Sequence, residues 1–263
     1  MKISYFAVCF CVLPCLLFAQ DKSAEPTADQ VLAVAKQAVA ELTGVELVDG
    51  KDEALECVGP VYSFGEPGFK IASGTLWVWT RNGIQRPAAV LSLATIDVRR
   101  FFEFHSFSEN PLTFPILGGK WQPAAAWQPL ELPNAPAPAE TEQRRLSQMK
   151  LLTQRFKSTV RVIPGDRIDE MRILPTPIYR YPNTTKERDG AVFVVSRDGD
   201  PEALLIIETT SKGWQYMPAR LSGHVPTIIL DGKPTELSYL MGPSQPYFYT
   251  FRLAGTKESP IPR

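Results

Sequence analysis

Histidine, cysteine and recognisable catalytic motifs are all scarce in this chain. Its 263 residues include two histidines, His105 and His224, and four cysteines. It contains no Gly-x-Ser-x-Gly elbow, phosphate-binding glycine loop, His-Glu-x-x-His helix or paired-cysteine zinc spacing. The signatures of serine hydrolases, nucleotide-binding enzymes and zinc proteins are therefore missing, and we predict no catalytic residue, no metal ligand and no cofactor. A dispersed site assembled from distant residues stays open.

An excess of either charge is also missing. Lys and Arg together number 28, Asp and Glu together number 28, and no basic run stands out. A neutral balance of this kind argues against nucleic acid and against anionic membrane surfaces as partners. We expect an unknown protein or a small apolar ligand instead.

The first 19 residues have the features of a signal peptide. Lys2 precedes an apolar run from Ile3 to Phe18, and Ala19 offers a small residue for cleavage. The run has about 16 residues, whereas a bilayer-spanning helix needs about 20. We expect export, periplasmic or extracellular, with no integral membrane segment after cleavage; retention as an N-terminal anchor is the alternative. Cleavage leaves Cys57 as the single cysteine, which we expect to be a buried thiol that behaves as a small hydrophobe.

Two stretches of the chain resemble each other at a nearly constant distance. GTLWVWTRNG at Gly74–Gly83 is echoed by GAVFVVSRDG at Gly190–Gly199, which begins 116 positions later (190 − 74). GPVYSF, from residue 59, is echoed by TPIYRY, from residue 176. A repeat of fixed period indicates two copies of one structural unit. The alternative is that two hairpins with glycine turns look alike by chance.

Each stretch lies in a segment that predicts one helix followed by antiparallel strands. The domain organisation that we expect is a signal peptide at 1–19, a first helix and sheet unit at 20–121, a Pro- and Ala-rich linker at 122–138, and a second unit at 139–263. The second helix is predicted at 140–157. The predicted class is α+β, with two tandem, duplicated units of a helix and an antiparallel meander, similar to cystatin-like and nuclear-transport-factor-like sheets.

Several predicted strands are apolar at every position rather than at alternate ones. The runs are Leu76–Trp79, Val192–Val195 and Leu204–Ile207. Continuous apolar strands are typical of sheets that are covered on both faces. Since one helix per unit covers one face, we expect the two sheets to pack on each other as one body.

Aromatic residues supply the only candidate binding site. Trp77 and Trp79 share one side of a predicted strand, and Phe102 and Phe104 share one side of another. Such a cluster either lines a pocket for an apolar or sugar-like ligand or forms part of the core. Glu103 with His105 is a weak metal-binding pattern, because metal ligands usually come in threes or fours.

Longer strings carry a resemblance to a known group of proteins. These strings are LPTPIYRY at 174–181, DGAVF at 189–193, DPEALL at 200–205 and PNAPAP at 133–138. The chain resembles a family of exported proteins from planctomycete-type bacteria that has no assigned function. The resemblance implies export and a shared fold, and it implies no catalytic residues.

Three functions are compatible with these observations. The first is an exported, non-enzymatic protein that binds a ligand or a partner. The second is a periplasmic hydrolase with a dispersed active site around His105 or His224. The third is a purely structural component of the cell envelope.

Overall fold

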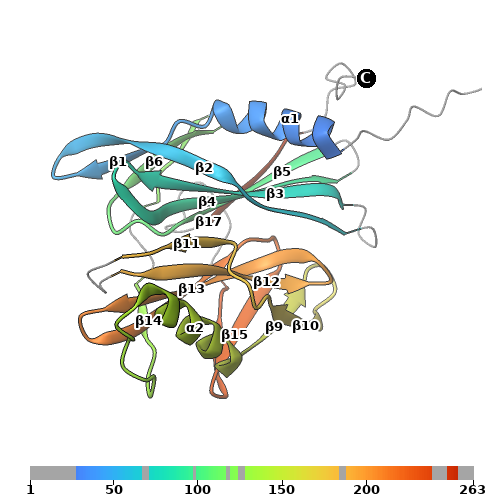
Figure 1. The fold of residues 1–263 in the computed structure, drawn as a ribbon. Coiled ribbons are helices and arrows are strands. Elements are labelled where there is room, and N and C mark those ends of the chain that lie inside the picture. Colours follow the sequence, from blue (N-terminus) through green and yellow to red (C-terminus); the bar gives the residue numbers. More distant parts are fainter. Residues whose placement is uncertain are drawn as a thin grey trace, which may run out of the picture.

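The computed structural model describes residues 28–66, 71–96, 99–116, 119–123, 128–183, 188–238 and 248–253. These residues form two curled antiparallel sheets that stack face to face, with one helix on the outer side of each sheet (Figure 1). The described part is therefore mostly β structure. The expected α+β class is correct only in the sense that helices and antiparallel sheets are both present.

The first sheet has eight strands and is covered by helix α1 (Ala28–Ala40). Its spatial order is β17-β5-β4-β3-β2-β1-β6-β7. The strands are β1 (Val45–Val48), β2 (Lys51–Glu66), β3 (Ile71–Arg81), β4 (Ile84–Ile96), β5 (Arg99–Ser106), β6 (Leu112–Ile116), β7 (Gly119–Trp121) and β17 (Phe248–Leu253).

The second sheet has nine strands and is covered by helix α2 (Glu142–Leu152), which a 3-10 turn at Thr153–Arg155 extends. Its order is β16-β15-β9-β10-β12-β13-β14-β8, and β11 pairs with β12 beside β10. The strands are β8 (Leu130–Glu131), β9 (Phe156–Val162), β10 (Arg167–Ile173), β11 (Tyr179–Tyr181), β12 (Gly190–Arg197), β13 (Asp200–Thr210), β14 (Gly213–Arg220), β15 (Val225–Leu230) and β16 (Lys233–Glu236).

The expected second helix, 140–157, is too long at its C-terminal end. Helix α2 ends at Leu152, and Phe156 already begins β9. Phe156 is buried, and its ring lies 5.1 Å from that of Tyr216, in a T-shaped arrangement. Packing against the sheet therefore overrides the helical spacing of the apolar residues in this segment.

The two sheets have the same internal strand order. The series β5-β4-β3-β2-β1-β6-β7 corresponds to β14-β13-β12-β10-β9-β15-β16. The long strand β2 corresponds to two strands of the second sheet, β10 and β11. Pairing registers correspond as well: Val45 pairs with Thr113, and Thr159 pairs with Thr227, each 114 positions later (159 − 45 and 227 − 113). The offset is 116 in β10 and β12, because the β9–β10 turn is two residues longer than the β1–β2 turn.

The same glycine–aromatic contact occurs once in each sheet. Gly74 pairs with Phe64, and Gly190 pairs with Tyr181. A Cβ atom on Gly74 would lie 2.1 Å from Phe64 Cζ, and one on Gly190 would lie 2.2 Å from Tyr181 Cζ. Only glycine leaves room for the ring at either place.

One short strand from each half pairs with the sheet of the other half. Strand β8, inside the range 122–138 expected to be a linker, pairs with β14 through Gln215 and Glu131. Strand β17, inside the range 139–263 expected for the second unit, pairs with β5 along its whole length. These two exchanges join the halves at equivalent sheet edges.

The apolar runs are covered on both faces, as expected. Leu76 and Val78 of β3 lie in one cluster with Val192 and Val194 of β12, between the sheets. Their neighbours in sequence face the helices: Trp77 packs with the α1 cluster, and Phe193 and Val195 pack with the α2 cluster. Burial of each large apolar side chain is worth about 1.5–3 kcal/mol, so this two-sided packing is the main source of stability.

Candidate ligand-binding site

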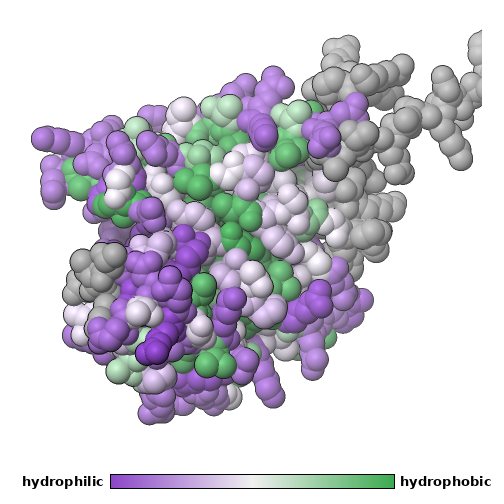
Figure 2. Space-filling model, in the orientation of Figure 1, coloured by the Kyte–Doolittle hydropathy of each residue, from purple (hydrophilic) through white to green (hydrophobic). Residues whose placement is uncertain are grey.

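A hollow of about 350 Å³ lies between α1, the edge of β2 and the face of β3. Its lining residues are Lys36, Val39, Ala40, Leu42, Thr43, Leu55, Cys57, Gly59, Trp77 and Trp79. We call this hollow the tryptophan groove. Separately, hydrophobic residues form a band through the middle of the face shown in Figure 2, and hydrophilic residues lie around this band.

The sequence explains why the groove stays open. Helix α1 presents small or medium-sized residues to the sheet, among them the buried Ala35 and Val39. A helix with short side chains fills less of the space above the sheet than one with long side chains. Beyond its four pairs with β1, moreover, strand β2 has only β3 as a neighbour among the described strands. One wall of the groove is therefore an open strand edge.

Two tryptophans form the floor of the groove and are held in place by specific contacts. Trp77 Nε1 donates a hydrogen bond to Thr75 Oγ1 at 2.9 Å, so that its one polar group is satisfied within the sheet. Trp79 packs edge-on against Phe114 with ring centroids 5.4 Å apart. Trp77 and Trp79 are only 3% and 1% exposed, so each ring reaches the groove with a small, fixed, apolar part of its surface.

The other two candidate residues lie behind this floor. Phe102 and Phe104 belong to the same apolar cluster as the tryptophans, and all four side chains are buried, with at most 3% of any of them exposed. The Phe104 ring is 6.4 Å from that of Trp79. Neither phenylalanine is among the residues that line the groove. The structure thus brings the four aromatics together, but only the tryptophans face a ligand-sized space.

Cys57 lies at the rim of the groove, opposite Trp79 in the β2–β3 pairing. The expectation of a buried thiol is wrong, because the residue is exposed on the open edge of β2. Its thiol group nevertheless faces an apolar surrounding, and desolvation raises the pKa of Cys57 to about 11. The thiol is therefore protonated at neutral pH.

The corresponding place in the second half carries a larger side chain. Ile173 pairs with Val195 in the second half, and Cys57 pairs with Trp79 in the first half, 116 positions earlier (173 − 57 and 195 − 79). Ile173 packs against the cluster that contains Met149 of α2. The second half therefore has isoleucine where the first half has the cysteine at the rim of the groove.

The two histidines do not line the tryptophan groove. His105 is 0% exposed, its ring lies 4.9 Å from that of Phe107, and burial lowers the pKa of His105 to about 3. His224 Nδ1 accepts a hydrogen bond from the backbone N–H of Ile163 at 3.1 Å. Burial and the nearby Arg197 and Arg220 lower the pKa of His224 to about 4.

Glu103, on β5 near His105, is a half-buried carboxyl group. Burial and the acidic side chains of Asp200 and Glu202 raise the pKa of Glu103 well above its usual range. Among the residues that the structure describes, no group of three or more His, Cys, Asp and Glu side chains could hold a metal ion.

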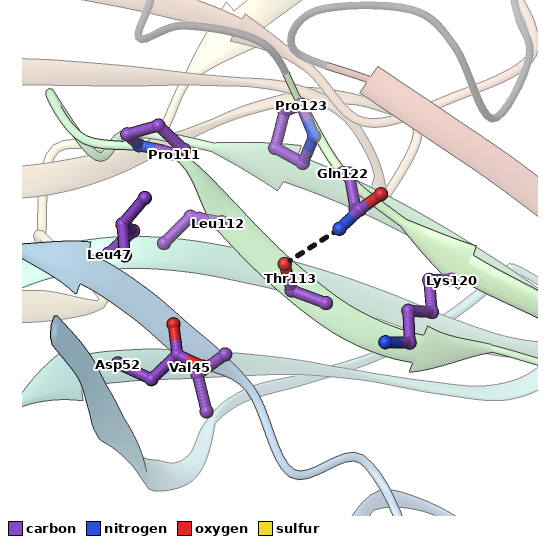
Figure 3. Close-up of a pocket in the computed structure, with 9 residues that line it drawn as sticks. All are labelled: Val45, Leu47, Asp52, Pro111, Leu112, Thr113, Lys120, Gln122 and Pro123. Atoms are coloured by element: carbon purple, nitrogen blue, oxygen red, sulfur yellow. Dashed lines mark hydrogen bonds between the residues drawn. The ribbon is translucent and has the colours of Figure 1, made fainter. Parts of the chain in front are cut away.

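A second hollow, of about 420 Å³, lies where β1, β6 and β7 meet (Figure 3). It is lined by Val45, Leu47, Asp52, Pro111, Leu112, Thr113, Lys120, Gln122 and Pro123. The Gln122 amide donates a hydrogen bond to Thr113 Oγ1 at 3.1 Å across one end of it. Sequence motifs did not point to these residues, since they come from two hairpins that are distant in the sequence, β1–β2 and β6–β7. Only a comparison of the two halves, residue by residue, draws attention to the residues of this hollow. We call this hollow the β1–β6–β7 pocket.

No family model matches the chain, and neither the curated proteins nor the solved structures contain a significant match. Neither of the helices within the described ranges is long and apolar enough to cross a membrane.

Proposed function

We propose that this protein is an exported, non-enzymatic binding protein whose tryptophan groove holds a small apolar ligand. The observation that carries the proposal is the hollow of about 350 Å³ with Trp77 and Trp79 as its floor. Ligand pockets are typically concave, apolar and pre-formed, with volumes of about 300–1,000 Å³. Hydrogen bonding and ring packing hold both tryptophans ready, so binding requires little ordering of side chains.

The alternative, a hydrolase around His105 or His224, has less support. A general base must reach the substrate proton within hydrogen-bond distance. The His105 ring is fully buried and packs against Phe107 in a tilted arrangement, and the His224 ring nitrogen Nδ1 already accepts a backbone hydrogen bond. The geometry therefore favours binding over catalysis.

A titration with the neutral fluorophore N-phenyl-1-naphthylamine tests the proposed binding. We expect a saturable rise in its emission, together with quenching of tryptophan fluorescence by energy transfer. The variant Cys57→Ile introduces the side chain that the second half carries at the same place, and it should weaken binding about tenfold or more by filling the groove. The variant Ile173→Val, at the equivalent place in the second half, is the matched control and should bind as the wild type does. No saturable signal, or equal binding by Cys57→Ile, would show that the groove is not a binding site.

The two halves of the chain also support a duplication of one ancestral unit. Three features point to it: the shared strand order, the paired contacts of Gly74 with Phe64 and Gly190 with Tyr181, and the reciprocal exchange of β8 and β17. An exchange of identical elements is how swapped dimers form, so the fused chain has the architecture of a strand-swapped dimer. If the units are equivalent, replacing the turn Asp49–Gly50 by the four residues 163–166 should leave the protein folded, as circular dichroism and thermal unfolding can establish.

A further inference from the structure

The β1–β6–β7 pocket has a structural counterpart around β9, β15 and β16 of the second half. Strand pairing defines the correspondence, because Phe114 pairs with Trp121 as Ile228 pairs with Thr235, 114 positions later (228 − 114 and 235 − 121). The same offset holds for β1 and β9. Every residue that lines the pocket can therefore be compared with its equivalent around β9, β15 and β16.

In the second half an ion pair spans this place. Arg161 Nη2 lies 3.8 Å from Glu236 Oε1. With the offset of 114, their equivalents in the first half are Leu47 and Gln122, both of which line the pocket (161 − 47 and 236 − 122). Leu47 has no charge, and the Gln122 amide turns to Thr113 instead. The first half therefore lacks this ion pair at the place of the pocket.

The walls of the pocket show the opposite change. Asp52 and Lys120 line the pocket, and they lie on opposite sides of it, with the ammonium nitrogen of Lys120 turned toward the hollow (Figure 3). Their equivalents in the second half are the uncharged Ile168 and Pro234 (168 − 52 = 116 and 234 − 120 = 114). The second half therefore has an ion pair, Arg161 with Glu236, beside uncharged side chains at the equivalents of Asp52 and Lys120. The first half has these two charged side chains and no such ion pair.

We propose that the β1–β6–β7 pocket binds a ligand that carries a cationic group and a carboxylate joined by a short aliphatic stem. The cation pairs with Asp52, the carboxylate pairs with Lys120, and the stem lies on Leu47 and Pro111. A guanidinium group suits the Asp52 side best, because its planar donors match a carboxylate. The ligand thus supplies from outside the pair of charges that Arg161 and Glu236 supply within the second half. This site is separate from the tryptophan groove, and neither proposal depends on the other.

Two sources offer this chemistry: a free arginine-like amino acid and the C-terminal residue of a polypeptide that ends in arginine. Nα-acetyl-L-arginine carries one guanidinium and one carboxylate and is the first probe. Its methyl ester lacks the carboxylate, and Nα-acetyl-L-leucine lacks the cation. An acetylated pentapeptide that ends in arginine represents the polypeptide source, and tighter binding of that peptide than of the single residue would identify it.

Amide resonances of the ¹⁵N-labelled protein report the titration. We expect saturable shifts at Thr113 and at the Gln122 side-chain amide with Nα-acetyl-L-arginine. Each one-charge probe should bind up to about fivefold more weakly, since exposed ion pairs are worth up to about 1 kcal/mol each. The double variant Asp52→Asn/Lys120→Gln should lose most of the binding. Both side chains are exposed, so this variant should fold like the wild type.

A second variant is designed to close the pocket with the ion pair that the second half carries. Leu47→Arg together with Gln122→Glu places the bridging pair of the second half at the same register, and it should abolish the shifts. Cys57→Ile, which fills only the tryptophan groove, should leave them unchanged. Absence of saturable shifts with the wild type, or undiminished shifts in the closed variant at an unchanged unfolding temperature, would overturn the proposal.

Discussion

Arg86 of β4 and Glu208 of β13 form a bidentate ion pair between the two sheets. Arg86 Nε donates to Glu208 Oε2 at 2.9 Å, and Arg86 Nη2 donates to Glu208 Oε1 at 3.1 Å. The Tyr181 hydroxyl and the Gln215 amide donate to the same carboxylate at 3.0 and 2.5 Å. The pair links residues 122 positions apart, and both side chains are buried.

Replacing Arg86 by Met should destabilise the protein by about 3–5 kcal/mol, because it leaves a buried carboxylate without its cation. Denaturant unfolding followed by tryptophan fluorescence measures the change. Replacing both residues, as in Arg86→Met/Glu208→Met, should recover a large part of the loss, since no unpaired charge then remains. A single variant within about 1 kcal/mol of the wild type would contradict the structural role of this pair.

The thiol of Cys57 should react slowly with Ellman's reagent at pH 8. Its pKa is raised to about 11 by desolvation, and only the thiolate attacks a disulfide. The pKa is about two units above the usual value, so the rate should be about 100-fold below that of the unfolded protein and should rise about tenfold per pH unit up to pH 10. The variant Cys57→Ser corrects for any other thiol. A rate equal to that of the unfolded protein, levelling off above about pH 9, would show that the groove rim is fully solvated.

His105 should make the protein lose stability as the pH falls below about 6.5. Burial lowers the pKa of His105 to about 3 in the folded state, so the unfolded chain takes up the proton first. The stabilisation is fully present above the unfolded pKa and is lost at up to about 1.4 kcal/mol per pH unit as the pH falls toward 3.

Denaturant unfolding of the wild type and of His105→Gln between pH 7 and pH 4 tests this expectation. The variant should show a flatter decline, because it lacks the titrating ring. His224→Gln is the companion variant, since His224 also has a lowered pKa, of about 4. Parallel curves for the wild type and His105→Gln would contradict a neutral buried imidazole.

A cut of the chain at residues 124–126 should not separate the halves. Strand β17 lies after the cut and pairs with β5, and the apolar cluster between the sheets contains residues from both fragments. A protease site placed there should give two fragments that co-elute in size-exclusion chromatography and separate only in denaturant. Elution as two independent folded pieces would show that the two sheets are autonomous domains.

The apolar strings already predicted much of this architecture. Continuous runs such as Leu76–Trp79 and Val192–Val195 required cover on both faces, and the structure places helices on one side and the other sheet on the opposite side. The turns at Asn82–Gly83 and Asp198–Gly199 also fall between paired strands, with positive φ at both glycines. These features depend on local periodicity and turn chemistry, which a sequence displays directly.

Long-range pairing could not be read from the sequence in the same way. The short strand Leu130–Glu131 lies in a stretch that looks like a linker, and it becomes a strand only because the edge of β14 is available. The segment from Met171 to Tyr181, in contrast, is divided into β10 and β11 around Pro175 and Pro177, which the sequence displays. The pairing of β8 depends on which sheet edge is free in the folded molecule, and the chain order does not record that.

The sequence by itself determined the apolar layers and the resemblance between the two halves, because side-chain periodicity and turn residues act over a few positions. Only the tertiary structure decided that Trp77 and Trp79 face an open groove while Phe102 and Phe104 do not. The reason is physical: an open space depends on the volumes of side chains that meet from distant segments, here α1, the edge of β2 and the face of β3.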